Sequence, residues 1–405
     1  MTTTINNKNK KPNVPNLRFP EFQGEWEKCK LGDITTICGG YAFNSKELSS
    51  KKGLYQVVKM GNLYQNNLDL NRTPSFINYI DSKSNKVLLH YGDIAITLTG
   101  TNNKRDFGYS YMFTTEQNLL LNQRCGLIRT EHNPYFVYNL VKTNSFLNQF
   151  FESSIGGTGN QANVSTKSME SFSVYIPKSK EQRKIADLLR LLDERIATQN
   201  KIIEDLKKLK SAIIEIEYTP NAKTTSHIGD VIEQISKRNK NNAIQNVLSV
   251  SNRQGFIKQS DQFENRNVAS EDTSNYKIVE QNDFAFNPAR INVGSISRLT
   301  TFEKGIVSPM YVCFRTQENV APEYIDYFFE SKHFYCEIQK RLEGSVRQCL
   351  SFEGLCNIPL SLPSFEMQQR IGKRLFTLGQ KIKTETDLLE LLNKQKQYLL
   401  RQMFI

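Results

Sequence analysis

The sequence predicts a mixed α/β protein. We expect two similar α+β domains joined by two long antiparallel helices that form a coiled coil, with a pseudo-two-fold internal repeat. The prediction rests on two main observations: the sequence resembles itself at an offset of 186 residues, and each copy ends in a long stretch with apolar residues at helical spacing. In addition, each stretch directly follows a short strand pattern that ends in proline.

The repeat is clearest where the two helical stretches begin. The segment EQRKIADLLRLLDERI (181–196) returns as MQQRIGKRLFTLGQKI (367–382), and no gap is needed to align the copies from there to the C-terminus. Ser179 and Gln182 form an S-x-x-Q capping box at the start of the first helix, and Ser364 can cap the second. These signals place both helix starts with little ambiguity.

Each helical stretch carries an a/d heptad seam, with apolar residues at alternating steps of four and three. The polar interruptions also coincide, since Gln199 aligns with Glu385. A single helix of about 37 residues would leave its apolar stripe exposed, so we expect the two helices to bury their seams against each other. The predicted seam residues are Ile185, Leu189, Leu192, Ile196, Ile203, Leu206, Ile213, Ile371, Leu375, Leu378, Ile382, Leu389, Leu392 and Leu399.

Shorter repeated motifs lie upstream of each helix. LGDI (31–34) is answered by IGDV (228–231), and YGDIAI (91–96) is answered by QNDFAF (281–286). These motifs predict one domain before each helix. The predicted parts are an N-terminal tail (1–27), a first domain (28–177), a first long helix (178–218), a second domain (219–363) and a second long helix (364–405).

The short connection after the first helix decides the expected orientation. That helix ends near Tyr218, and the opening motif of the second domain starts about ten residues later, within roughly 35 Å of the helix end. The second domain then enters the second helix with no linker after Pro363. We therefore expect the helices to run antiparallel, with the two domains at opposite ends of the pair.

The composition points toward a polyanionic ligand. Fifty-three Lys and Arg residues against 41 Asp and Glu residues give a net charge of +12, which favours nucleic acid. No apolar run approaches the roughly 18 residues of a membrane span, and the N-terminal residues have no signal-peptide core, so we expect a cytoplasmic protein without membrane contact. Seven scattered cysteines without a CxxC pair predict neither a disulfide framework nor a metal site.

Two pairs of polar loops carry the chemistry expected of a DNA-reading surface. TNNKRDFGYSY (101–111) corresponds to NPARIN (287–292), and GGTGNQAN (156–163) corresponds to GSVRQ (344–348). Arg can pair with guanine edges, Asn and Gln with adenine, and Lys with phosphates, although such loops can also be plain solvated turns. The candidate DNA-binding residues are Lys104, Arg105, Tyr109, Tyr111, Asn160, Gln161, Asn163, Arg290, Asn292, Arg298, Arg347 and Gln348.

Motifs for catalysis are missing from the sequence. There is no G-x-x-x-x-G-K-[ST] phosphate loop, and GGTG (156–159) does not match G-x-G-x-x-G between a strand and a helix. NPYF (133–136) is one proline short of an adenine-methylating motif and fits a helix start with proline at its first position. The four histidines form no Ser-His-Asp pattern. We therefore predict a non-catalytic chain with no catalytic residues, no metal and no cofactor of its own.

Three segments resemble the specificity subunit of Type I restriction-modification enzymes: the opening (13–34), the first helix (176–210) and the C-terminal part (362–404). The similarity covers nearly the whole chain, including its repeat. It implies two target recognition domains, each of which reads one half of a bipartite, asymmetric site in double-stranded DNA. It also implies two methylation subunits and two restriction subunits as partners. Those partners would bind S-adenosylmethionine, ATP and Mg, and would perform N6-adenine methylation and restriction.

Some features depart from the family pattern. The first helix ends in KKLKSAIIEIEY (207–218) rather than in the pattern of the second helix, and Met367 replaces an expected acidic residue. Recognition loops vary too much within the family for residue roles to be transferred, so the candidate DNA contacts rest on chemistry alone. Two alternatives remain open: a self-contained DNA methyltransferase or nuclease, and a coiled-coil scaffold without a nucleic-acid role.

Overall fold

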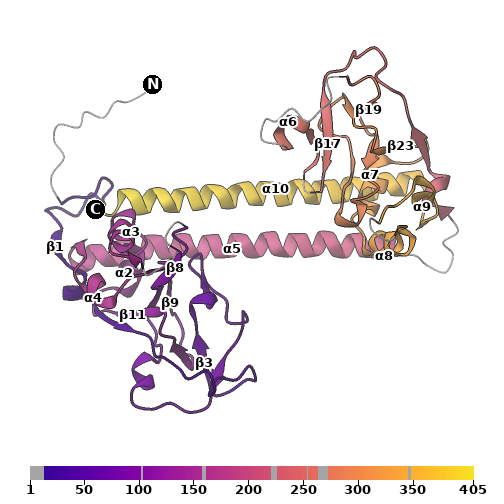
Figure 1. Cartoon of the computed structure of the whole chain (residues 1–405). Coiled ribbons are helices and arrows are strands. Elements are labelled where there is room, and N and C mark those ends of the chain that lie inside the picture. Colours follow the sequence, from indigo (N-terminus) through magenta and orange to yellow (C-terminus); the bar gives the residue numbers. More distant parts are fainter. Residues whose placement is uncertain are drawn as a thin grey trace. The chain divides into compact units, whose positions relative to one another are not determined.

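The computed structural model describes residues 13–101, 104–156, 161–219, 226–252, 254–262, 272–344 and 348–405. The chain divides into two compact units, and we describe each by itself (Figure 1). The first unit comprises Met1–Thr198 with Leu388–Ile405, and the second unit comprises Gln199–Asp387. Each unit contains one α+β domain, one part of helix α5 (Ser179–Tyr218) and one part of helix α10 (Phe365–Gln402).

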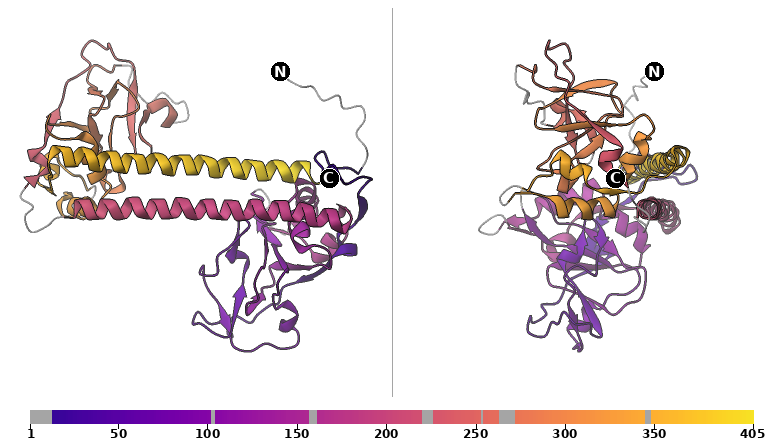
Figure 2. Two further views of the ribbon diagram at one scale, coloured as in Figure 1. Left: turned by 180° about the vertical axis from the view of Figure 1, so that it is seen from behind. Right: turned by 90° about the vertical axis from the view of Figure 1, so that its right-hand side faces the viewer.

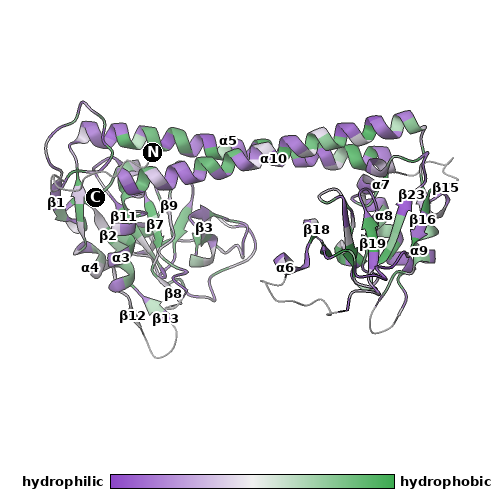
Figure 3. Cartoon of the chain, turned by 90° about the horizontal axis from the view of Figure 1, so that it is seen from above, coloured by the Kyte–Doolittle hydropathy of each residue, from purple (hydrophilic) through white to green (hydrophobic). Residues whose placement is uncertain are grey.

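The domain of the first unit is built around two packed sheets, with smaller sheets beside them. The central sheet is antiparallel with the order β2-β11-β7-β9, and its strands β7 and β11 are hydrophobic along most of their length (Figure 3). A second sheet has the order β10-β3-β6, and a buried cluster that includes Val58, Ala95, Leu121 and Leu127 joins the two sheets. The strands of this unit are β1 (Glu27–Lys30), β2 (Thr36–Gly39), β3 (Tyr55–Val58), β4 (Leu63–Tyr64), β5 (Asn67–Leu68), β6 (Phe76–Ile77), β7 (Ile94–Thr97), β8 (Thr99–Thr101), β9 (Ser110–Met112), β10 (Leu119–Leu121), β11 (Cys125–Arg129), β12 (Ile155–Gly156), β13 (Gln161–Asn163) and β14 (Ser173–Ile176).

Short capped helices cover the central sheet of the first unit. Helix α2 has Pro134 at its start, where the missing N–H costs nothing, and the Asn133 side chain accepts a hydrogen bond from the N–H of Phe136. Thr143 caps α3 in the same way through Phe146. The helical segments are α1 (Leu31–Ile34), α2 (Pro134–Leu140), α3 (Asn144–Glu152) and α4 (Thr166–Glu170), with 3-10 turns at η1 (Met60–Asn62) and η2 (Ser84–Val87).

The second unit repeats this plan. Its central sheet has the order β16-β23-β20-β21, which matches β2-β11-β7-β9, and the parallel pair β17/β22 matches β3/β10. Its strands are β15 (Ser226–His227), β16 (Ile232–Ile235), β17 (Val247–Ser251), β18 (Gly255–Lys258), β19 (Lys277–Glu280), β20 (Phe284–Phe286), β21 (Ile296–Arg298), β22 (Lys304–Val307), β23 (Val312–Thr316) and β24 (Pro359–Leu360). Its helical segments are η3 (Ile228–Asp230), α6 (Gln259–Gln262), η4 (Ile291–Val293), α7 (Pro322–Phe328), α8 (Lys332–Arg341) and α9 (Phe352–Cys356).

Side-chain interactions repeat along with the strands. Arg129 pairs with the buried Asp93 at 2.9 Å in the first unit, and Arg315 pairs with Asp283 at 3.1 Å in the second. In each ion pair the aspartate also accepts a hydrogen bond from a backbone N–H three residues before it. The internal repeat predicted from the sequence is therefore confirmed down to individual side chains.

The glutamines of the repeated helix motif have a role that differs from the predicted capping box. Gln182 donates to the carbonyl of Pro177 at 2.8 Å, and Gln368 donates to the carbonyl of Pro363 at 2.9 Å. The side-chain oxygen of Gln368 also accepts from the backbone N–H of Ala321 at 3.0 Å. Each glutamine thus fastens the start of a long helix to its own domain.

The two long helices are paired antiparallel, as predicted, and they run side by side in the views of Figures 1 and 2. In the first unit Asp193 of α5 forms an ion pair with Lys396 of α10. In the second unit Gln199 of α5 contacts Glu385 of α10, and Glu217, further along α5, contacts Arg374 at 3.6 Å. Residue numbers thus rise along α5 as they fall along α10, which is the order of an antiparallel pair. All fourteen predicted seam residues are buried or half-buried.

The end of each long helix completes a domain core. In the first unit Phe404, which follows α10, stacks on Phe136 of α2 with ring centroids 5.2 Å apart. In the second unit Tyr218, at the end of α5, packs on Tyr324 of α7 at 4.7 Å. Tyr218 aligns with Phe404 in the 186-residue repeat, so both domains use the same kind of aromatic anchor.

The prediction of an N-terminal tail over 1–27 needs correction for residues 13–27, the part that the structure describes. The Arg18 guanidinium binds Glu181 at the start of α5 with distances of 2.7 and 2.8 Å. Trp26 is buried, and its indole N–H also donates to Glu181 at 3.2 Å. The N–H of Leu17 donates to the carbonyl of Gln402 at 2.8 Å. This segment lacks a periodic pattern, so its packing could not be predicted from the sequence.

A buried polar pair interrupts the helix seam in the second unit. The Gln199 side-chain N–H donates to the Glu385 carboxylate at 2.5 Å and to the Glu385 carbonyl at 3.0 Å, with only 2% and 9% of the two residues exposed. We predict that Gln199→Leu and Glu385→Leu each destabilise the protein by about 1–3 kcal/mol, because each removes the buried hydrogen bond to a charged group, while Glu385 also pairs with Lys381 of its own helix. The double variant should cost less than the sum of the singles. A double-mutant cycle from urea unfolding measures this, and purely additive values would contradict it.

A lysine of the first unit stands where the second unit has a glutamate. Lys142 lies over the Tyr138 ring at 3.5 Å, and its pKa is lowered well below the ordinary value by loss of water around the ammonium and by the charge of Lys396. The equivalents of Lys142 and Lys396 are Glu330 and Lys210, which form an ion pair at 2.6 Å.

We predict that Lys142→Glu stabilises the first unit, because it removes the repulsion between two ammonium groups and gives Lys396, which already pairs with Asp193, a second carboxylate partner. The lowered pKa means that the folded state binds this proton more weakly than the unfolded state. The wild type should therefore lose stability as the pH falls from about 10 toward the folded-state pKa, and Lys142→Met should lose less. Urea unfolding between about pH 7 and 10 checks both expectations. Parallel pH profiles of wild type and Lys142→Met would contradict the account.

Candidate nucleic-acid interface

Strand pairing brings the two predicted loops of the first unit together. β8 pairs with β13 so that Thr101 lies opposite Gln161 and Thr99 lies opposite Asn163. The loop that follows β8 carries Lys104 and Arg105, which are exposed, as are Gln161 and Asn163. Four of the candidate residues therefore share one surface, whereas Asn160 lies outside the described residues.

Hydrogen bonds join the described residues on the two sides of the loop after β8. Its Asp106 carboxylate accepts hydrogen bonds from the N–H of Thr101 at 2.6 Å and from the Thr101 hydroxyl at 3.2 Å, and these bonds lower the pKa of Asp106. Arg105 adopts a left-handed backbone conformation with a φ of 46°, and its guanidinium lies 5.1 Å from the centre of the Phe151 ring. The described part of this loop thus holds Arg105 against Phe151 and ties Asp106 to Thr101, which lowers the entropy cost of using Arg105 in binding.

Tyr109 belongs to the same face as the loop, through the strands beside it. Its N–H donates to the Thr97 hydroxyl, and its ring meets Tyr64 edge-on with centroids 5.5 Å apart. Burial raises the pKa of Tyr109, so the hydroxyl stays protonated at neutral pH. Sequence reasoning missed Tyr64, which lies on a short hairpin 45 residues before its partner.

Two candidate residues of the prediction are structural instead. Tyr111 is half-buried in β9, where it packs edge-on against Phe113 at 5.2 Å in the cluster between the two sheets. Arg298 binds Glu323 at 2.7 Å and Asp326 at 3.2 Å, with only 9% of its side chain exposed. We therefore exclude both residues from the candidate DNA surface. The Tyr111 ring is used in packing between the sheets, and the Arg298 charge is neutralised inside its domain.

The second unit assembles a corresponding loop pair. The N–H of Leu350 donates to the carbonyl of Pro288 at 3.0 Å, as the N–H of Val164 donates to that of Leu98 at 2.9 Å in the first unit. This contact brings the segment with Arg290 and the half-buried Asn292 beside the segment with the exposed Gln348, while Arg347 lies outside the described residues. The candidate residues on these two neighbouring segments are Arg290, Asn292 and Gln348.

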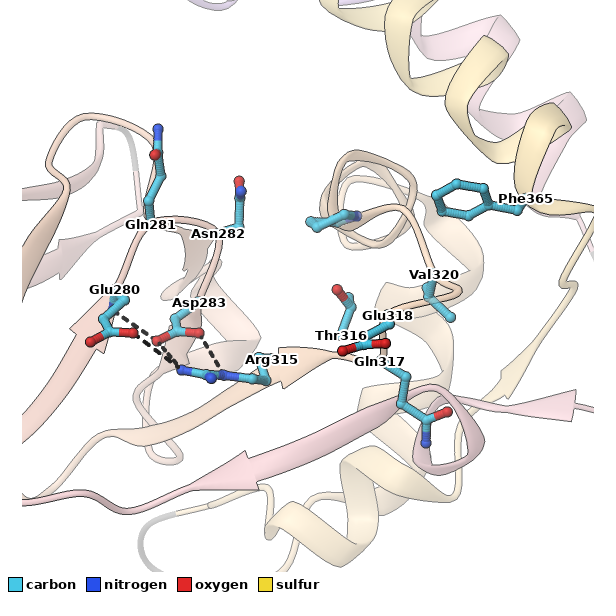
Figure 4. A pocket seen from close by; sticks show the side chains of 11 residues that line it. Glu280, Gln281, Asn282, Asp283, Arg315, Thr316, Gln317, Glu318, Val320 and Phe365 are labelled. Atoms are coloured by element: carbon cyan, nitrogen blue, oxygen red, sulfur yellow. Dashed lines mark hydrogen bonds and ion pairs between the residues drawn. The ribbon is translucent and has the colours of Figure 1, made fainter.

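A hollow of about 320 Å³ lies beside the strand ends of the second unit (Figure 4). Arg315 lines the hollow and forms ion pairs with Asp283 and Glu280. Burial raises the pKa of Asp283, although Arg315 acts in the opposite direction. Among the described residues, no group of three or more His, Cys, Asp or Glu side chains is arranged to hold a metal. Ion pairs join three of the charged residues that line this hollow, Glu280, Asp283 and Arg315, and Glu318 lines it as well.

Exposed apolar side chains on the long helices were also missed by the sequence reasoning, which considered only the seam. They are Leu191, Leu391 and Tyr398 in the first unit, and Ile202, Leu209, Ile216, Phe365 and Phe376 in the second. Ile202, Leu209 and Ile216 are spaced by seven residues and form one stripe off the seam. Within the described parts of the chain, no helix is long and apolar enough to cross a membrane. The exposed fractions of these side chains range from 39% for Ile202 to 76% for Ile216.

Comparisons with known proteins agree with this architecture. Two relatives from Methanocaldococcus jannaschii are the putative type I restriction enzyme MjaX specificity subunit and the type I restriction enzyme MjaVIII specificity subunit. The first is 22% identical over 96% of this chain and 93% of its own length, and the second is 23% identical over 95% and 90%.

Two solved structures share the fold. The S subunit of the Type I restriction-modification system from M. genitalium matches with a TM-score of 0.61 and 16% identity, covering 97% of this chain and 99% of its own. A chain of a type I R-M system complex matches with a TM-score of 0.51 and 14% identity, covering 93% and 96%. The family model described as the Type I restriction modification DNA specificity domain matches residues 23–208 and again 220–394. The chain thus belongs to the Type I restriction-modification DNA specificity family.

Proposed function

We propose that this chain reads a bipartite, asymmetric site in double-stranded DNA, with one domain for each half-site. The observation that supports this most is that both domains place exposed cations and amides at the same point of a shared scaffold, while the loop sequences differ. A shared scaffold lets both domains dock alike on DNA, and different loops let each read its own sequence. Two linked readers multiply their affinities and recognise a split target.

The loop chemistry fits division between backbone and base contacts. Lys104 and Arg105 suit phosphates or guanine edges, and Gln161 and Asn163 suit adenine edges. In the second domain Arg290, like Arg105, suits phosphates or guanine edges, and Asn292 and Gln348 supply amides that suit adenine edges. The net charge of +12 supports the sequence-independent part of the affinity.

We further propose that the helix pair docks the methylation subunits of the complex, and that motor-nuclease restriction subunits complete it. The exposed stripe of Ile202, Leu209 and Ile216 supports this, since apolar side chains on a water-facing helix favour a protein partner. The partners would transfer a methyl group to adenine N6 with S-adenosylmethionine, and would use ATP and Mg for restriction. This chain would contribute the choice of sequence and no catalytic group.

The decisive test is methylation by the assembled complex. The chain would be produced with its methylation subunit, supplied with S-adenosylmethionine, and the modified adenines mapped by single-molecule sequencing. We expect a motif of two short words with a fixed gap. A continuous motif would refute the two-reader proposal, and methyl transfer by the purified chain alone would favour a self-contained methyltransferase.

A loop variant tests the proposed phosphate contacts. We predict that Lys104→Ala with Arg105→Ala weakens DNA binding by the complex and reduces the slope of log affinity against log salt by roughly two, since each neutralised phosphate contributes about 0.9. Lys28→Ala with Lys30→Ala is the matched control, because it removes the same charge from the exposed edge of β1. Equal slopes for the two variants would show that the loop does not contact the backbone.

A length variant tests the proposed role of the helix pair as a spacer. One heptad would be inserted into both α5 and α10 beside Gln199 and Glu385, so that the seam stays in register. We predict an unchanged pair of half-sequences and a gap longer by about three base pairs, since seven residues add roughly 10 Å. Motif mapping would measure the gap. An altered half-sequence with an unaltered gap would reverse the roles of helices and domains.

A further inference from the structure

A hairpin of the first domain, formed by β4 and β5, has a base in the core and a tip in solvent. At its base Leu63 is buried in the cluster between the two sheets, where Leu68 also packs. At its tip Tyr64, Gln65, Asn66 and Asn67 are all exposed. The turn residues Gln65 and Asn66 have φ values of 50° and 62°, as a tight two-residue turn between twisted strands requires. The chain thus projects polar and aromatic side chains from a firmly anchored ribbon.

Three contacts fix this hairpin beside the loop that carries Lys104 and Arg105. The Asn66 side chain accepts from the N–H of Ser110 at 2.8 Å, which joins the tip to β9. Tyr64 meets Tyr109 of the loop face edge-on. On the neighbouring turn, the Thr99 hydroxyl in β8 donates to the Met60 sulfur at 3.1 Å. The hairpin therefore extends the candidate DNA surface of the first domain.

Arg72 is positioned over this hairpin by a buried amide. The Asn62 side-chain NH₂ donates to the carbonyls of Asp69 and Arg72 at 2.9 and 2.7 Å, and its oxygen accepts from the N–H of Lys59 at 2.8 Å. The Arg72 guanidinium then lies 5.9 Å from the centre of the Tyr64 ring, which is 51% exposed. An arginine held over an exposed tyrosine gives a cation and a flat apolar surface in one place.

Resting on the proposed function, we infer that this hairpin enters the major groove and reads bases of the half-site bound by the first domain. A two-stranded ribbon fits the major groove, which is about 12 Å wide. Gln65 at the tip presents an amide that matches the N6 and N7 edge of adenine. Arg72 presents a guanidinium that matches the O6 and N7 edge of guanine, and Tyr64 offers apolar contact to a thymine methyl.

The loop with Lys104 and Arg105 then has a different task from the hairpin. The loop holds the domain on the backbone, and the hairpin selects the sequence. Loss of a base contact should change the preferred word without changing the salt dependence, whereas loss of a phosphate contact should change the salt dependence for all sequences. This contrast separates the two elements by experiment.

The test is motif mapping with the full chain in its complex with the methylation subunit, using Gln65→Ala, Arg72→Ala and Gln65→Arg. We expect each alanine variant to lose about tenfold to hundredfold preference at one or two positions of one half-site. Gln65→Arg should shift one position from adenine to guanine, a gain that misfolding cannot produce. The second half-site and the gap should stay unchanged in all three variants.

A Tyr64→Ala variant tests the exposed ring of the hairpin, and Tyr79→Ala is its matched control. Tyr79 is 74% exposed, belongs to the same domain and lies outside β4 and β5. If wild type modifies a split motif and the hairpin variants keep that motif unaltered, the hairpin inference is wrong and the proposed function stands. If wild type modifies no split motif, the proposed function itself fails. A change in the half-site that Tyr79→Ala also produces would likewise overturn the assignment of the hairpin.

Discussion

Burial of the two apolar seams is the constraint on which the rest of the fold depends. Neither long helix could keep its stripe of Ile and Leu in water, so in each unit α5 and α10 must pair. The domain cores then continue onto the same helices: Ile185 and Leu189 belong to the core of the first unit, and Ile371 and Leu375 to that of the second. A reading surface on either domain is therefore supported by a core that includes both helices.

Buried polar side chains set the register of the two helices, which the apolar seam alone leaves open. An apolar stripe with a seven-residue period tolerates displacement by a heptad, whereas a buried amide and carboxylate are satisfied in only one alignment. Gln199 and Glu385 supply that alignment in the second unit. Gln182 and Gln368 do the corresponding work at the helix starts, where each binds the carbonyl of a proline five residues earlier. Gln182, which was predicted to be part of a capping box, and its counterpart Gln368 both connect a helix to its domain.

The sequence was sufficient for the architecture because the repeat and the heptad seam are local, periodic signals. The antiparallel pairing followed from chain reach alone, and the structure agrees with it. The packing of residues 13–27 could not be foreseen, since Arg18 and Trp26 meet Glu181 across more than 150 residues without any pattern in between. The site was predicted less well for the same reason. Arg298 looked like a solvent-facing cation until Glu323 and Asp326 were placed beside it, and Tyr64 could not be linked to Tyr109.

The closing contact of Phe404 with Phe136 and Trp26 has a consequence for biosynthesis. The first domain leaves the ribosome early, yet Leu399, Met403 and Phe404 of its core are translated only after the whole second domain. Throughout synthesis of the second domain, Trp26 and Phe136 lack their contact with Phe404. A nascent chain interrupted before α10 would thus display an unfinished N-terminal domain to chaperones and proteases. The core of the first domain is therefore complete only once α10 and the residues after it have been synthesised.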